Sequence, residues 1–173
     1  MKLALRMVAV VVIASACLVT SCDTKGSFGV ERIYFEQNDI SINFRRSDGI
    51  ETFSTLFPKD INDIPYIELD SIISIKLTDT VDRISLHEQI LNTDGTPKFD
   101  EKLDLYPDYK YNSEGNEISF VVLKNPAVSF SSDINDYKLG QLIRGFTLDL
   151  YENDKSVKYC FVIRTDPTQK ENE

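Results

Sequence analysis

The sequence predicts an all-β domain with the architecture of an immunoglobulin-like antiparallel sandwich of about seven to nine strands. Three observations support this fold class. Apolar and polar residues alternate over much of the chain, turn-forming residues recur roughly every 8 to 15 residues, and no helical segments alternate with the strand patterns. A small lipocalin-like barrel is the alternative architecture. The sequence contains no Trp and too few cysteines for a disulfide within the domain, so the likeness to immunoglobulin domains concerns architecture only.

The first strands are predicted over residues 30–35 and 40–44. In the second of these segments three apolar residues alternate cleanly with polar ones, which is typical of a half-buried strand. Residues 47–49, which read Ser-Asp-Gly, predict a turn. Residues 50–56 are then expected to return as a partner strand. Residues 57–65 contain two prolines and are expected to form a loop or a short helical turn.

The middle of the domain continues the pattern of short strands and turns. Residues 72–77 are dense in isoleucine and form the clearest strand of this part, and residues 84–91 follow as a weaker one. Residues 92–95 read Asn-Thr-Asp-Gly and predict a turn. Alternation over residues 103–106 predicts another short strand, and residues 112–116 predict a further turn.

The last part of the domain has the strongest strand patterns. Residues 118–123 are apolar on both faces, which favours a central strand. Residues 131–142 allow a helical turn, but a connection between the two sheets is the preferred interpretation because a glycine weakens the helix. Residues 146–151 and 157–164 alternate strictly on either side of a polar turn at 152–156, so they predict a long antiparallel hairpin.

The N-terminus has the three parts of an export signal. Lys2 and Arg6 supply positive charge, and residues 7–19 are uncharged. A stretch of this length is shorter than the ~20 apolar residues that cross a bilayer. It ends in Val19-Thr20-Ser21-Cys22, which resembles the lipobox of bacterial lipoproteins.

This resemblance implies that Cys22 becomes the first residue of the mature protein. Its sulfur would carry a diacylglycerol, and its amino group a further acyl chain such as palmitate. Two or more chains anchor a protein stably at a membrane surface. An ordinary secretory signal and an uncleaved anchor remain the alternatives. The expected organisation is a signal peptide over 1–21, a lipidated cysteine and tether over 22–29, a single β domain over 30–165, and a polar tail over 166–173.

The rest of the chain resembles the small lipoproteins of Bacteroides-type bacteria, many of which have immunoglobulin-like sandwiches. The resemblance implies a protein of the cell envelope, with the outer membrane preferred over the inner membrane. Asp23 follows the lipidated cysteine and is itself followed by Thr24 and Lys25, so an acidic surface-export signal is incomplete. The periplasmic face and the cell surface therefore both remain open.

Charge and cysteine content narrow the function further. Removing residues 1–21 takes away two basic residues and no acid, so the formal charge changes from −9 to −11. Nucleic acid is not an expected partner, because binding it requires clustered Lys and Arg. Cys160 is the single cysteine of the mature domain besides Cys22, and its apolar strand context predicts a small buried side chain.

No catalytic or cofactor-binding motif was found, so we expect a protein that is not an enzyme and has neither catalytic residues nor a cofactor. His87 is the only histidine, and it is predicted to lie with Ser85 on a solvated strand face. No metal site is expected. The strongest of the weak metal candidates is a calcium site formed by oxygens between Asp94 and Asp104, but the EF-hand spacing is not met.

Tyr106, Tyr109 and Tyr111 lie in an acidic, loop-like segment and are the candidate binding residues. Exposed tyrosines beside carboxylates contact sugars or proteins, although tyrosines at a strand edge also cover the rim of a core. The expected function is a lipid-anchored extracytoplasmic binding or accessory module with a protein or glycan partner. A small-ligand carrier or hydrolase is the alternative.

These two functions predict different structures. A binding module predicts an exposed patch and no cluster of buried ionisable groups. A carrier or hydrolase predicts a deep pocket in which polar groups converge.

Overall fold

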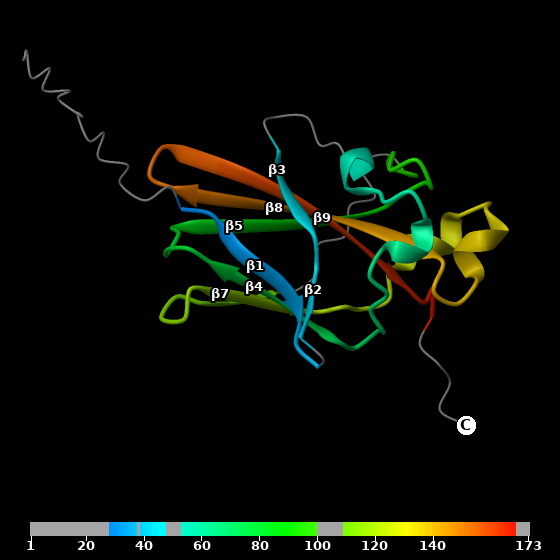
Figure 1. Cartoon of the computed structure of the whole chain (residues 1–173), viewed down its shortest axis with the longest axis horizontal. Helices are drawn as coiled ribbons and strands as arrows, with labels where there is room; N and C mark the ends of the chain where they lie inside the picture. The colour runs from blue at the N-terminus through cyan, green and yellow to red at the C-terminus, as the bar shows by residue number, and fades with distance from the viewer. Residues whose placement is uncertain (1–27, 38, 48–52, 100–108, 169–173) are drawn as a thin grey trace, which may run out of the picture.

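The computed structural model describes residues 28–37, 39–47, 53–99 and 109–168, which fold into two antiparallel β-sheets packed face to face (Figure 1). Their strands are β1 (Val30–Phe35), β2 (Ile40–Ser41), β3 (Phe44–Ser47), β4 (Ile72–Leu77), β5 (Arg83–Ile90), β6 (Tyr109–Asn112), β7 (Glu117–Val121), β8 (Leu142–Glu152) and β9 (Lys155–Thr165). Four short 3-10 helices lie between them: η1 (Phe53–Leu56), η2 (Ile61–Asp63), η4 (Pro126–Phe130) and η5 (Ile134–Tyr137).

The strand order confirms the predicted sandwich. One sheet has the order β2-β1-β4-β7-β6 and the other has the order β3-β9-β8-β5. Without β2 and β3, the two sheets have the ABED and CFG orders of a constant-type immunoglobulin domain. The alternative of a small closed barrel is wrong, because the strands form two separate sheets rather than one closed one.

The core lies between the two sheets and is built from alternate residues of the strands. The inward-facing strand residues are Ile33, Phe35, Ile73, Ile75, Leu77, Ile84, Leu86, Ile118, Phe120, Phe146, Leu148, Leu150, Val157, Tyr159, Phe161 and Ile163. Phe146 and Phe161 stack with their ring centroids 4.9 Å apart, and the ring of Phe120 lies 5.4 Å from that of Phe146. These three rings come from β7, β8 and β9 and fill the centre of the core.

The four-stranded sheet is also covered on part of its outer face. Phe53, Ile64 and Leu91 pack there against Ile143 and Val162 in a second apolar cluster. This cover explains why β8 and β9 are buried on both faces along most of their length. The hairpin that they form confirms the predicted one, although its turn is tighter than expected.

Two predicted strands near the N-terminus are wrong. The segment 40–44 divides between the sheets, because β2 ends at Ser41 and β3 begins at Phe44, with Ile42 buried between them. The predicted partner strand 50–56 ends in the helix η1, which buries Phe53 against the outer face of the four-stranded sheet. Residues 48–52 lie outside the described residues.

Other elements match their predictions more closely. The interrupted alternation near the start of β1 corresponds to a register shift between Val30 and Arg32 in its pairing with β4. The strand β7 is an interior strand, as predicted, although Val121 is exposed on its outer face. The predicted strand 103–106 lies outside the described residues. Within the described ranges, no helix is long and apolar enough to cross a membrane.

Candidate binding surface

The connection from β7 to β8, residues 122–141, covers one end of the sandwich, and we call it the distal loop. It appears in yellow in Figure 1, at the end opposite the blue start of the described chain. The strand pairing agrees with this view. Val30 pairs with Leu77, whose N–H donates to Asn116 just before β7, whereas the distal loop follows the other end of β7. The start of the domain and the distal loop therefore lie at opposite ends.

The distal loop exposes an unusual share of the molecule's large apolar side chains. Seven such side chains are exposed among the described residues, and six of them lie between residues 121 and 139. Phe130, Ile134 and Leu139 are the most accessible, with 69%, 72% and 66% of their surface exposed. Single exposed apolar residues are common on protein surfaces, but a concentration in one segment marks a candidate interaction site.

The distal loop is held in place by capped helical turns. Asn125 accepts a hydrogen bond from the N–H of Ala127 at the start of η4. Asp133 accepts one from the N–H of Asn135 at the start of η5. Such side-chain acceptors satisfy N–H groups that a helix leaves unpaired at its N-terminus. Each turn therefore has a defined conformation even though both helices are short.

A buried polar network joins the two turns. The Asp136 carboxylate accepts hydrogen bonds from the Lys98 ammonium, at 2.6 Å, and from the Ser131 hydroxyl. Lys98 also pairs with Asp133 at 3.3 Å. The Tyr137 hydroxyl donates to the carbonyl oxygen of Ser131 at 2.8 Å and lies 3.0 Å from that of Val128. The ring of Tyr137 thereby fixes η5 against η4.

The pKa of Asp133 is lowered from its ordinary value by this arrangement. The largest cause is the hydrogen bond from the backbone N–H of Asn135, and the hydrogen bond from Lys98 adds to it. The Asp133 carboxylate therefore lies beside the Lys98 ammonium in ionised form near neutral pH.

The far end of the distal loop is attached to the end of β9. Asp166 accepts a hydrogen bond from the N–H of Gly140 at 2.7 Å and another from the Tyr66 hydroxyl at 2.9 Å. Arg164 donates to the carbonyl oxygens of Gly140, Asn62 and Ile64. Asp166, the first residue of the expected polar tail, is only 5% exposed.

Positive charges predominate on the surface of the distal loop. Asp136 is buried against Lys98, and Asp133, whose side chain is 42% exposed, lies 3.3 Å from the same ammonium, whereas Lys124 and Lys138 are both exposed. Lys138 donates to the uncharged amide oxygen of Asn135. The loop thus presents apolar and cationic groups on a chain whose formal charge is −9.

His87 lies on the outer face of the four-stranded sheet beside two residues that suggest hydrolytic chemistry. The Ser85 hydroxyl is 2.8 Å from Nε2 of His87, and the Asp149 carboxylate is 3.8 Å from that same nitrogen. A catalytic triad places its serine and its acid on different ring nitrogens. Asp149 also lies 3.7 Å from Lys158. These three residues therefore do not form a triad.

Glu88 and Arg144 form an ion pair buried between the sheets, which departs from the structure expected of a simple binding module. Asn125 donates a hydrogen bond to Glu88 and also caps η4, so the pair supports the base of the distal loop. Its position and partners indicate a structural role.

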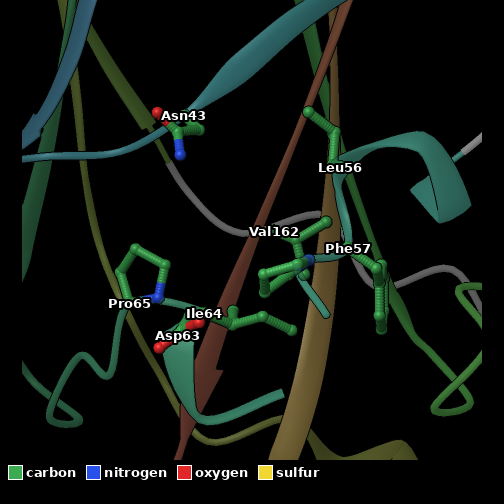
Figure 2. A pocket seen from close by; sticks show the side chains of 8 residues that line it. Asn43, Leu56, Phe57, Asp63, Ile64, Pro65 and Val162 are labelled. Atoms are coloured by element: carbon green, nitrogen blue, oxygen red, sulfur yellow. The ribbon is translucent and has the colours of Figure 1, made fainter. Parts of the chain in front are cut away.

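A cavity of about 170 Å³ lies beside η2, between β3 and the segment that covers β9 (Figure 2). Apolar side chains such as Leu56, Phe57 and Val162 share its walls with the polar residues Asn43 and Asp63. It lies outside the sandwich core and is smaller than typical ligand sites of about 300–1,000 Å³.

The candidate tyrosines are only partly described. The ring of Tyr111 packs against the core, and its hydroxyl accepts a hydrogen bond from the N–H of Val81 at 3.1 Å. The backbone of Tyr109 lies in β6 and pairs with Phe120. Tyr106 and Cys22 lie outside the described residues. A binding role for these tyrosines stays a prediction.

The predicted calcium segment is described only at its beginning. The Asp94 carboxylate accepts hydrogen bonds from the hydroxyl and N–H of Thr96, and these bonds lower its pKa. Residues 100–108 lie outside the described residues. Among the residues that are described, no group of three or more His, Cys, Asp or Glu side chains is arranged to hold a metal ion.

Sequence reasoning missed the distal loop as a surface. Phe130, Ile134 and Leu139 are separated by polar residues without a regular period, so the pattern did not distinguish exposed from buried side chains. Asn125-Pro126 and the segment that begins at Asp133 are typical starts of helical turns. They were the sequence signal that could have indicated an ordered loop here. No protein-family model, curated protein or solved structure matches this chain.

Proposed function

We propose that this protein is a lipid-anchored, non-catalytic binding module of the cell envelope. The lipid on Cys22 would hold it at a membrane, with the outer membrane preferred, and the distal loop would contact a partner. The anchor rests on the lipobox resemblance of residues 19–22. The binding function rests on one observation, the concentration of exposed apolar side chains on a well-anchored loop.

The loop has the properties that favourable binding requires. Covering exposed apolar side chains releases about 25 cal/mol for each Å² removed from water. Binding to a mobile loop loses part of this free energy, because ordering the loop costs conformational entropy. The capped turns and the contacts of Lys98 and Tyr137 hold the backbone before any partner arrives.

The direction of the loop also supports the proposal. Only residues 23–27 separate Cys22 from the described domain, and the chain from residue 22 to residue 28 reaches at most about 20 Å. The distal loop lies at the opposite end of the sandwich from the start of the described chain at residue 28 (Figure 1). A module held in this way would present the loop away from its own membrane.

The alternative of a carrier or hydrolase has less support in the described residues. The interior of the sandwich is filled by side chains such as Ile75, Phe146 and Phe161, each 0% exposed. The cavity beside η2 is small, and the polar groups around His87 lie on an open sheet face rather than in that cavity.

The anchor is tested by replacing Cys22 with serine in the full-length protein. We expect a fatty-acid analogue to label the wild type in growing cells and not to label Cys22→Ser. Persistent labelling of the variant would show that the lipid is attached elsewhere.

The binding surface is tested by the accessibility of an introduced thiol. Ile134→Cys and the matched control Ile40→Cys each place a thiol at an exposed apolar position, and Cys160 is buried. We expect a maleimide to label both variants equally in purified protein, but Ile134→Cys much less in isolated envelope membranes. Equal labelling of the two variants in membranes would contradict a partner at the distal loop.

A further inference from the structure

We infer that the partner of the distal loop is a protein with an apolar cleft bordered by carboxylates. This inference rests on the proposed function and specifies its partner. It follows from three properties of the loop: the kind of side chains it exposes, the use of its polar groups, and the sign of its unpaired charge.

The exposed side chains suit a protein cleft better than a glycan. Phe130, Ile134 and Leu139 are purely apolar, and two of them are aliphatic. Sugar recognition requires hydrogen-bonding groups around a flat aromatic face. Here several polar side chains of the loop are already used within it. Asn125 and Asp133 cap the two turns, and Ser131 and Asp136 bond to each other.

The charge of the loop indicates which kind of residue borders the cleft of the partner. Lys124 and Lys138 are exposed, whereas Asp136 is buried against Lys98 and the half-exposed Asp133 shares the same ammonium. Within the described ranges Lys124 has no ion-pair partner. Carboxylates around the cleft would complement these two lysines. The acidic remainder of the domain would repel such a partner, so only an approach at the distal loop is favourable.

A bilayer is a less suitable occupant. The loop faces away from the tethered end, so reaching the same membrane would require the domain to lie flat on it. The mature chain carries a formal charge of −11, because removing residues 1–21 takes Lys2 and Arg6 from a total of −9. An anionic membrane surface would repel the acidic side of a domain that lies flat on it.

A second copy of the chain is also disfavoured. A symmetric contact between two distal loops would bring the same patch of each copy together. The exposed Lys124 and Lys138 of both copies would then be gathered in one interface, which is unfavourable because like charges repel.

The experiment places a photoreactive amino acid at position 134 of the full-length lipoprotein, with position 40 as the control, and irradiates intact envelopes. We expect one protein adduct from position 134 and none from position 40. Mass spectrometry should map the adduct to an apolar cleft that contains Asp or Glu. Crosslinking to a site without carboxylates would overturn the inference.

The charge requirement is then tested with the purified partner. We expect Lys124→Glu with Lys138→Glu to weaken binding about ten-fold or more at low salt, and a reversed charge at the mapped carboxylates to restore part of it. An unchanged affinity would overturn the inference. The control Lys110→Glu changes an exposed lysine of β6 and should have little effect.

Two further measurements examine the other occupants. Vesicles of phosphatidylcholine with phosphatidylglycerol should not bind the purified domain, and sedimentation should show a monomer. Vesicle binding or dimerisation that is lost in Phe130→Ser with Leu139→Ser would overturn the protein partner but leave a binding role for the loop. Equal maleimide labelling of Ile134→Cys and Ile40→Cys in membranes would instead contradict the proposed function itself.

Discussion

The guanidinium of Arg144 donates two hydrogen bonds to the carboxylate of Glu88, with donor–acceptor distances of 2.8 and 2.6 Å. The two residues are 1% and 4% exposed and face the sandwich interior from β8 and β5. The remaining nitrogen, Nη1, has no hydrogen-bond partner among the described residues. Such a pair adds little net stability, but removing one member leaves a buried charge alone.

The first prediction concerns this ion pair. Glu88→Gln keeps the shape of the side chain and the partner of Asn125 but removes the charge that compensates Arg144. We expect it to lower the free energy of unfolding by about 3–5 kcal/mol. The double variant Glu88→Gln with Arg144→Met should recover most of this loss because no buried charge remains. Urea unfolding measures both, and a double variant less stable than the single one would contradict the explanation.

A second prediction concerns Lys98 and the distal loop. Lys98→Met leaves the buried Asp136 carboxylate without its cationic partner, which costs about 1–3 kcal/mol. We expect faster hydrogen exchange of the amides of residues 131–139, by roughly ten-fold or more, with a smaller change in the strands. Lys138→Met is the matched control, since that ammonium bonds only an exposed amide oxygen. Equal effects of the two variants would contradict a special role for Lys98.

The third prediction follows from close packing over β8. A Cβ atom at Gly145 would lie 2.7 Å from Cδ1 of Leu91 and 2.8 Å from Cε1 of Phe53, and both side chains are buried. Gly145→Ala should therefore cost about 1–3 kcal/mol. Gly115→Ala is the control, because its nearest atom is the side-chain nitrogen of Asn112. Thermal unfolding compares them, and a Gly145→Ala protein as stable as the wild type would show that this cluster is loosely packed.

The fourth prediction is a dependence of stability on alkaline pH. Burial and the hydrogen bond to Asp166 raise the pKa of Tyr66 from 10.0 to about 12. A raised pKa means that the folded state favours the neutral phenol, so its contribution is complete below pH 10.0 and is lost towards about pH 12. We expect this loss of stability to be smaller in Tyr66→Phe by less than about 1 kcal/mol, since the phenol is only partly buried and solvent screens the interaction.

Denaturant unfolding at several pH values between neutrality and about pH 12 measures the effect of Tyr66. Tyr66→Phe also removes the hydrogen bond to Asp166, so its stability at neutral pH serves as the reference for each curve. Parallel curves for the wild type and the variant would contradict the assigned role of the phenol.

The fold could be predicted from the sequence where alternation alone determines burial. Residues 146–151 and 157–164 alternate strictly, and they form the hairpin that was expected. The pattern failed at residues 40–44, because alternation does not reveal that a chain leaves one sheet for the other between Ser41 and Phe44. The prediction for Phe53 was wrong for a related reason. An apolar residue is equally compatible with a strand and with a helical turn that covers a sheet.

The candidate surface was less predictable than the fold. Ile134 and Leu139 resemble core residues in sequence, and only the three-dimensional arrangement shows that nothing in the described chain covers them. The ion pair of Glu88 and Arg144 was also hidden, since each charge occurs alone at an inward position of its strand and their partnership spans two strands.

The three phenylalanine rings at the centre of the sandwich have a practical consequence for how this protein is made. Because side chains such as Phe120, Phe146 and Phe161 fill the core and the domain has no pair of cysteines, it does not need an oxidising compartment or thiol-oxidising enzymes to reach its fold. Cys160, the single cysteine of the domain, is buried at 2% exposure. Residues 28–173 should therefore fold in a reducing cytoplasm as readily as after export, and their stability should not change when a reductant is added.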